Sequence, residues 1–296
     1  MKRTITVAAV ILFFTLSFFT CHPAYAESIG ALTEKAERGD AGAQFFLGVM
    51  YNEGHGVPQN YNEAAKWYRK AAEQGGGAAQ YNLGTMYRDG HGVQQDYAEA
   101  AKWFRKAAEQ GMAIAQSGLA AMYAQGIGVP QDATKAAKWF LKAAEQGDTR
   151  AQFLLGSMYA LGRGIPQDNA KAVKWLRKAG EQGDTDAQVY LGLAYRDGKS
   201  VRRNYAEAAK WFRRAAEQGD VNAQGNLGML YTTGLGVPQD FEEAYFWFDL
   251  AAVAGHEGDA AVKVVLAKKL SPQALAAAQK RARDWKPTGP SSQGKH

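Results

Sequence analysis

The chain contains the stretch GHGVPQNYNEAAKWYRKAAEQG at residues 54–75 and nearly repeats it as GHGVQQDYAEAAKWFRKAAEQG at residues 90–111. The two copies begin 36 residues apart, and this spacing continues along the chain without an insertion. A series of tryptophans marks it: Trp67, Trp103, Trp139, Trp175, Trp211 and Trp247. A fixed period of this length is typical of stacked helical repeats, and residues 41–256 accommodate six full copies.

Each repeat predicts a pair of helices. In the first repeat we expect a first helix over residues 41–52, with Gly54 just beyond it, where a left-handed residue ends a helix. A second helix follows, with Asn60 as its N-cap; in the second repeat Asp96 takes this position and Glu99 completes a capping box. A two-helix unit cannot bury its own apolar stripe, so the repeats must stack. The predicted fold is therefore an all-α solenoid.

Comparison of the six copies divides the first helix into two faces. One face keeps its residue types, which in the first repeat are Ala43, Gln44, Leu47, Gly48, Met50, Tyr51 and Gly54. These positions fall within one sector of the helix, so we predict that they pack. Gly48 is small so that the second helix can approach, and only Ala120 replaces it along the array. The second helix contributes Trp67 and its equivalents as buried structural residues, with Trp139 in the middle of the core.

The other face of the first helix varies between repeats, at positions 42, 45, 46, 49, 52 and 53 of the first repeat. Aromatic and aliphatic groups on an open surface suit recognition of an extended peptide or a partner helix. The predicted partner-binding residues are Phe45, Phe46, Val49, Glu53, Tyr81, Asn82, Arg88, Phe153, Leu154, Tyr190 and Arg196. The alternative is that several of these side chains fill gaps between successive first helices.

A loop in the fifth repeat is a second candidate site. It carries Lys199, Arg202 and Arg203, close to Arg196, and such a cluster would suit an acidic partner. Neutral variation of an exposed loop is the alternative.

The ends of the array call for caps, because a solenoid exposes apolar surface where stacking stops. Residues 27–40 are predicted to form a capping half-repeat that resembles a truncated second helix. In the sixth repeat, Phe246, Leu250 and Val253 stand where the first repeat has charged residues. We expect helices within residues 257–286, with a break at Ser271-Pro272, to cover this face, and residues 287–296 to be a disordered tail.

Residues 1–26 have the pattern of a cleaved signal peptide. Lys2 and Arg3 precede an apolar run over residues 7–19, and Ala24-Tyr25-Ala26 forms an A-x-A cleavage pattern. We expect cleavage after Ala26 and export to the periplasm or the medium; an uncleaved anchor is the alternative. Cleavage would remove Cys21 and leave no cysteine, hence no disulfide. The net charge of +6, two units of it in the leader, gives no argument for nucleic-acid binding.

The sequence predicts no catalytic residue, cofactor or metal site. His55 and His91 share a loop position, but other repeats place unrelated residues there and no further ligand recurs. The glycine-rich loops lack the Lys-Ser/Thr pair of a phosphate-binding loop. An enzyme acting on envelope polymers is the alternative, but no carboxylate pair or Ser/His set breaks the repeat pattern.

The repeat signature A-x-x-x-L-G-x-M-Y-x-x-G-x-G-V-P-Q-D-x-x-x-A-x-K-W-x-x-K-A-A-E-Q-G resembles the Sel-one-like repeat family, short relatives of the tetratricopeptide repeat. The segment from Leu270 to Trp285 is similar to the cap that closes many bacterial members. This resemblance implies a right-handed superhelix whose first helices line the concave side. It also implies an exported, non-enzymatic scaffold that binds a protein or peptide. Separately, we expect the protein to be a monomer. A secreted effector binding host proteins is the alternative. The fifth repeat departs from the signature at Ser200, where the second loop glycine is missing, which leaves its loop shape open.

Overall fold

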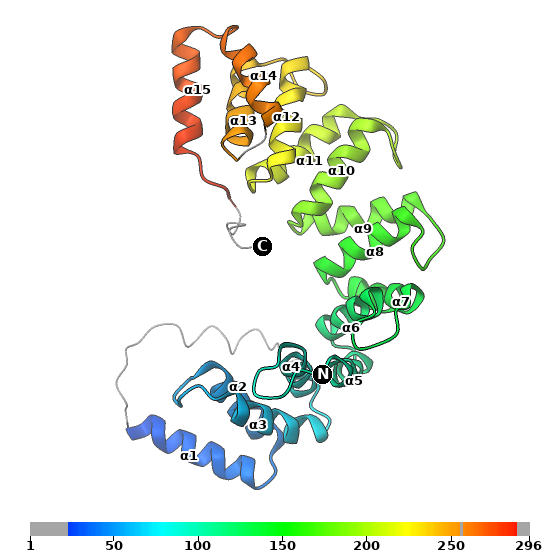
Figure 1. Cartoon of the computed structure of the whole chain (residues 1–296), viewed down its shortest axis with the longest axis vertical. Helices are drawn as coiled ribbons and strands as arrows, with labels where there is room; N and C mark the ends of the chain where they lie inside the picture. The colour runs from blue at the N-terminus through cyan, green and yellow to red at the C-terminus, as the bar shows by residue number, and fades with distance from the viewer. Residues whose placement is uncertain (1–22, 255–256, 289–296) are drawn as a thin grey trace, which may run out of the picture. The chain divides into compact units, whose positions relative to one another are not determined.

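The computed structural model describes residues 23–254 and 257–288, and within these ranges the chain forms helices and loops without a strand (Figure 1). The predicted leader lies outside the described residues except for its last four, which begin the first helix. The helices are α1 (Pro23–Glu37), α2 (Ala41–Glu53), α3 (Tyr61–Glu73), α4 (Gly77–Asp89), α5 (Tyr97–Glu109), α6 (Ala113–Gln125), α7 (Ala133–Glu145), α8 (Thr149–Leu161), α9 (Asn169–Glu181), α10 (Thr185–Asp197), α11 (Tyr205–Glu217), α12 (Val221–Thr233), α13 (Phe241–Val253), α14 (Glu257–Ala267) and α15 (Pro272–Asp284).

The chain divides into two compact units, residues 1–103 and 104–296, with the division inside α5. In the first unit α2 packs on α3 and α3 on α4. In the second unit the same alternation joins α6 to α7, α7 to α8, and each later helix to the next as far as α13. First and second helices therefore alternate as the repeat predicts, and the all-α solenoid is confirmed.

Helix ends follow the predicted turn chemistry with one correction. Asn60 accepts hydrogen bonds from the backbone N–H groups of Asn62 and Glu63, and Gly54 ends α2 at φ 75°. In the second repeat Asp96 caps α5 in the same way, but the reciprocal half of the predicted capping box is wrong. The Asp96 backbone N–H donates instead to the Tyr87 carbonyl at 2.9 Å, so it needs no side-chain acceptor.

The predicted packing face of the first helices is confirmed. The alanine, glutamine, leucine and glycine positions of that face are buried in every repeat. The glycine position explains how closely the two helices approach: a Cβ atom added to Gly192 would lie 2.5 Å from the Phe212 ring. Phe212 is itself fully buried, so the ring has no room to move aside.

The tryptophan series is not uniformly buried. Trp67, Trp175, Trp211 and Trp247 are buried, whereas Trp103 and Trp139 are half-buried. The expectation that Trp139 lies fully inside the core is therefore wrong. The Lys142 ammonium lies 4.4 Å from the Trp139 ring centroid, but buried Trp67 has the same contact with Lys70 at 4.2 Å, so the lysine does not account for the difference.

Six buried glutamines tie neighbouring helices together. Gln188 of α10 donates from Nε2 to the Gly180 carbonyl of α9 at 2.9 Å. Its Oε1 accepts from Gln218 Nε2, just past the end of α11, at 2.8 Å. Gln44, Gln80, Gln116, Gln152 and Gln224 make the same bond to a carbonyl eight residues earlier. Each amide therefore links its own repeat to the preceding second helix.

The N-terminal cap takes part in this linkage. The Ala36 carbonyl of α1 accepts from Gln44 Nε2 at 2.9 Å, as the carbonyl of a complete second helix would. Ala36 is fully buried, and Leu32 packs against the core cluster that contains Ala36 and Trp67. Helix α1 thus serves as the second helix of a half-repeat.

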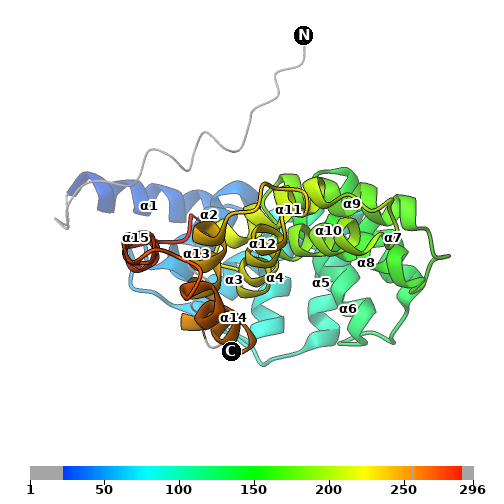
Figure 2. The same ribbon diagram turned by 90° about the horizontal axis from the view of Figure 1, so that it is seen from above.

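At the other end, α14 and α15 both lie against α13 (Figure 2). They bury Phe246 and half-bury Leu250, but Val253 stays 83% exposed, so the predicted cover does not reach the last turn of α13. Ser271 caps α15 as predicted, accepting from the Ala274 N–H at 3.2 Å. Thr288, placed in the predicted disordered tail, donates its N–H to the Glu217 carbonyl at 2.8 Å; residues 289–296 lie outside the described part.

The glutamine hydrogen bonds predict that the same substitution costs more stability in the fifth repeat than in the sixth. Gln188→Leu should lower the free energy of unfolding by about 2–4 kcal/mol, since it removes two buried hydrogen bonds and leaves both partners unpaired. Gln224→Leu is the matched control, because Ala254 stands where the other repeats supply the donor glutamine. Its loss should be smaller, about 1–2 kcal/mol. Urea unfolding followed by circular dichroism measures both; equal losses would contradict the two-bond role of Gln188.

The close approach of helices predicts a second pair of outcomes. Gly192→Ala should destabilise the protein by about 1–3 kcal/mol, because the new methyl group overpacks against Phe212. Gly30→Ala in α1 provides the control, since a Cβ atom added to Gly30 would have no neighbouring atom within 4 Å. That change should stabilise the protein by about 0.5–1 kcal/mol through helix propensity. If thermal melts show that both variants gain stability, the contact with Phe212 does not limit the approach.

Candidate functional site

The varied face of the first helices stays open in the structure. Its six positions per repeat are exposed or half-buried throughout, except for Ala160, which is buried. The neighbouring first helices cover part of this face without closing it. The division into a packed face and an open face, predicted from the repeat comparison, is therefore confirmed.

In the first compact unit the predicted partner-binding residues play different parts. Phe46 is 52% exposed, and its ring stands edge-on to that of Phe45, with centroids 5.7 Å apart. Phe45 is half-buried and lies 5.9 Å from Tyr68, and Val49 joins the same cluster. Phe45 and Val49 therefore support the core, and Phe46 presents its side chain outward.

The polar residues predicted at this face are mostly engaged within the chain. Asn82 is half-buried near Tyr68, and burial raises the pKa of the Tyr68 hydroxyl to about 12. The Arg88 guanidinium contacts Asp89 at 2.7 Å, and this hydrogen bond lowers the pKa of the Asp89 carboxyl. Glu53 pairs with His55 at 2.9 Å. The Arg88–Asp89 pair carries no net charge.

In the second compact unit Phe153 and Tyr190 are half-buried against the core cluster of α8–α11. The Arg150 guanidinium lies 5.0 Å from the Phe153 ring centroid, and Leu154 is half-buried. Arg196 contacts Asp197 at 2.7 Å and also Asn226 of the next first helix. Several of the predicted residues thus fill space between first helices, as the alternative interpretation anticipated.

Three exposed apolar residues on the open face escaped the sequence prediction. They are Ile114, Leu161 and Met229, exposed by 51%, 63% and 47%. They occupy the positions equivalent to 42, 53 and 49 of the first repeat, all on the varied face. Scanning every repeat for apolar residues at these positions, instead of favouring aromatic ones, would have identified them.

The loop of the fifth repeat keeps the turn of its relatives. Ser200 adopts φ 71°, the left-handed conformation that glycine takes at this position elsewhere. In the second repeat a Cβ atom at the equivalent Gly92 would lie 2.0 Å from the Tyr61 carbonyl oxygen. The fifth loop must therefore lie farther from the preceding second helix at this point. Helix α11 begins at the expected residue, with Asn204 as its N-cap.

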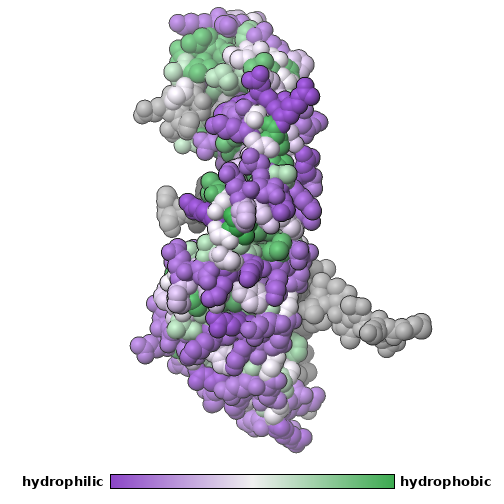
Figure 3. Space-filling view, turned by 90° about the vertical axis from the view of Figure 1, so that its right-hand side faces the viewer, coloured by the Kyte–Doolittle hydropathy of each residue, from purple (hydrophilic) through white to green (hydrophobic). Residues whose placement is uncertain are grey.

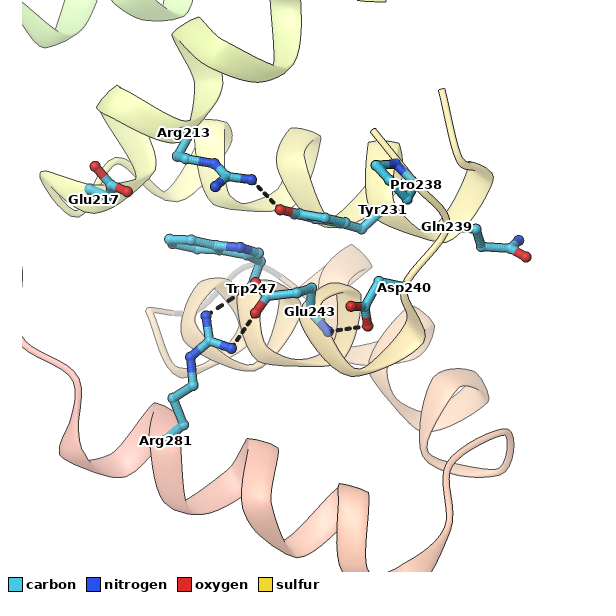
Figure 4. A pocket seen from close by; sticks show the side chains of 9 residues that line it. All are labelled: Arg213, Glu217, Tyr231, Pro238, Gln239, Asp240, Glu243, Trp247 and Arg281. Atoms are coloured by element: carbon cyan, nitrogen blue, oxygen red, sulfur yellow. Dashed lines mark hydrogen bonds and ion pairs between the residues drawn. The ribbon is translucent and has the colours of Figure 1, made fainter. Parts of the chain in front are cut away.

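A cavity of 410 Å³ opens beside α13 (Figure 4). The side chains around it include Arg213, Tyr231, Glu243, Trp247 and Arg281. Arg213 donates to the Tyr231 hydroxyl, and Arg281 pairs with Glu243. A second cavity, of 480 Å³, lies beside Arg69 and Tyr87 in the first compact unit.

Among the described residues, no group of three or more His, Cys, Asp or Glu side chains could hold a metal ion. His91 stacks on Tyr61, with ring centroids 4.9 Å apart. Within the same residues, no helix has the length and apolar character needed to cross a membrane.

The six repeats match the family model of the Sel1 repeat at residues 41–76, 77–112, 113–148, 149–184, 185–220 and 221–256. The chain belongs to the Sel1 repeat family. Sel1 repeat proteins generally mediate protein–protein interaction and are typically non-catalytic.

Two solved structures are similar over most of the chain. One is c5321, described as a protective antigen present in uropathogenic Escherichia coli strains and displaying an SLR fold. It is 36% identical, with a TM-score of 0.78, and the match covers 86% of this chain and 56% of that one. The chain thus spans little more than half of c5321. The other is a Sel1 repeat protein from Oxalobacter formigenes, 39% identical, with a TM-score of 0.65 and coverage of 78% and 95%. Among curated proteins, none matches the sequence.

The strained loop of this Sel1 repeat protein predicts a stabilising change. Ser200→Gly should raise the free energy of unfolding by about 1 kcal/mol, because glycine adopts the left-handed conformation without the steric cost of a side chain. Ser157→Gly in α8 is the control and should lower it by about 0.5 kcal/mol through helix propensity. Chemical denaturation measures both. Destabilisation by Ser200→Gly would show that the serine side chain makes a contact worth more than the strain.

Proposed function

We propose that this Sel1 repeat protein is an exported, non-enzymatic scaffold that binds a protein or peptide on the open face of its first helices. The proposal rests on the difference between the two faces of those helices. One face is buried in every repeat, whereas the other stays accessible and carries Phe46, Ile114, Leu161 and Met229 at 47–63% exposure. Large apolar side chains on an accessible, varied surface favour a partner that covers them.

The polar residues of the same face support this role. Arg88 and Arg196 are each paired with the neighbouring aspartate, so the face offers apolar anchors beside charges that are already neutralised. Binding at such a surface depends mainly on buried apolar area, worth about 25 cal/mol per Å². An extended peptide or an amphipathic helix could place an apolar residue against an anchor of this kind.

Export is part of the proposal and rests on the leader pattern of residues 1–26, with cleavage after Ala26. We propose a periplasmic or secreted, monomeric protein that does not bind nucleic acid. A secreted effector that binds host proteins is the alternative, and the description of c5321 as a protective antigen favours a location accessible from outside. Immunoblots of periplasm and culture medium distinguish the two locations, and a full-length cytoplasmic product would contradict both.

The binding face is tested by photocrosslinking in the native cell. Phe46 is replaced by benzoylphenylalanine, and Tyr97 on α5, an aromatic residue 41% exposed but outside the open face, is replaced in the same way as the control. Adducts should form at position 46 and not at position 97. Phe46→Ala should then weaken binding of the crosslinked partner about 5–30-fold, the cost of losing an apolar anchor. Identical adducts at both positions, or none at position 46, would contradict the proposed face.

A further inference from the structure

The two cavities are copies of one feature of the repeat. Arg69, Tyr87, Gln95, Asp96 and Glu99 line one of them. The residues 144 positions later, four repeats along, line the other: Arg213, Tyr231, Gln239, Asp240 and Glu243. Each cavity combines an arginine of one second helix with a tyrosine, a loop and a second helix of the next repeat. It therefore lies on the second-helix side, away from the open face proposed above.

Unused hydrogen-bond donors lie at the sixth-repeat cavity. Trp247 is 5% exposed, and its buried indole N–H has no hydrogen-bond partner. Burial raises the pKa of the Tyr231 hydroxyl, which accepts from Arg213 and keeps its own proton to donate. The indole nitrogen is enclosed by the protein, so the donor that a ligand oxygen can reach at this cavity is the exposed Arg213 guanidinium.

Of the three carboxylates around this cavity, one is paired with a cation among the described residues. Glu243 is held by the two guanidinium nitrogens of Arg281, and Asp240 accepts from two backbone N–H groups at the start of α13. Figure 4 shows Glu217 on the opposite side of Arg213 from Tyr231. Arg213 itself has no carboxylate within ion-pair distance among the described residues.

The fifth repeat makes the same arrangement more basic. Its equivalent residues include Arg177, which donates to the Tyr195 hydroxyl, and Trp211, which is 4% exposed with an unpartnered indole N–H. Where the second repeat has Gln94 and Gln95, the fifth has Arg202 and Arg203. Both of these arginines are exposed, and within the described part of the chain neither forms an ion pair.

We propose that the second-helix side of the fifth and sixth repeats binds an acidic peptide segment of a partner protein. Carboxylates of the segment pair with Arg177, Arg202 and Arg203, and a further oxygen of the segment accepts from the Arg213 guanidinium. Guanidinium groups bind planar carboxylates through paired hydrogen bonds, which favours this ligand. The donors also lie beside a cavity and not on a flat surface, which favours a peptide over a membrane. In Figure 3 most of the visible side is hydrophilic, and the apolar residues on it form separate patches.

The repeat itself supplies the variant that tests the proposal. Arg202→Gln/Arg203→Gln gives the fifth loop the glutamine pair of the second repeat, a loop that this chain already folds. The probe is a fluorescein-labelled peptide of about twelve alternating Glu and Ala residues, with a Lys/Ala peptide as its control. The parent should bind the acidic peptide alone, and the double variant about 5–10-fold more weakly, as expected for two exposed ion pairs. Binding should also weaken as NaCl rises from about 50 to about 500 mM.

The reciprocal change should create a second site. Gln94→Arg/Gln95→Arg installs the basic pair beside Arg69 and Tyr87, where a cavity is already present. The number of acidic peptides bound per chain should then rise from one to two, measured by isothermal titration. Circular dichroism melts confirm that each variant folds.

Three outcomes would overturn the proposal. The first is unchanged affinity of the folded Arg202→Gln/Arg203→Gln variant for the acidic peptide. The second is equal binding of the Lys/Ala peptide. The third is binding to phosphatidylglycerol vesicles without binding to the acidic peptide, which would assign the surface to membranes. None of these outcomes bears on the Phe46 crosslink, because the open face and the proposed peptide site have no residue in common.

Discussion

The structure depends on a buried primary amide that recurs in every repeat. Burying an amide group without hydrogen bonds is costly. Gln188 donates to a carbonyl of the preceding second helix and accepts from Gln218, which lies just past the second helix of its own repeat. These bonds span fixed sequence separations of eight and thirty residues. An insertion between the partners would break them, which gives a physical reason for a period of 36 residues that never slips.

Fixed packing on one side leaves the other side of each first helix free to vary. The glycine that faces Phe212 and the buried alanine and leucine positions are set by the close approach of two helices. Residues on the open face meet no such limit, so Phe46 and Asn82 can occupy equivalent positions. The second-helix side varies in the same way within its loops. Two surfaces of one scaffold can thus change independently while the core stays constant.

Local chemistry explains which features were predictable from the sequence. Asn60, Gly54 and Ser271 act on the backbone within a few residues, so helix ends and the cap at Ser271 follow from short patterns. The hydrogen bonds of Gln188 were not predictable from the sequence. The recurrence of glutamine at this position shows that the residue type is restricted, but it does not show which residues of other helices the side chain contacts. The exposure of Val253 depends on how far the capping helices α14 and α15 extend, which no local pattern reports. The partner remains outside the reach of the sequence, since the residues that complete the interface belong to another molecule.

The alanine at position 254 makes the two ends of the repeat array unequal in stability. Gln188 has a donor partner past the end of its own second helix, whereas the sixth repeat has only a methyl group at that position, and Val253 beside it is left uncovered. In a stacked repeat protein, each repeat is stabilised by its contacts with its neighbours. The repeat with the fewest such contacts should therefore unfold first. Under heat or mechanical load, the protein should then fray from its carboxyl-terminal repeat toward its middle. Backbone amides in α8–α10 should be the most protected from hydrogen exchange. A ligand bound to the sixth repeat should stabilise the whole array, because it would oppose the first step of unfolding.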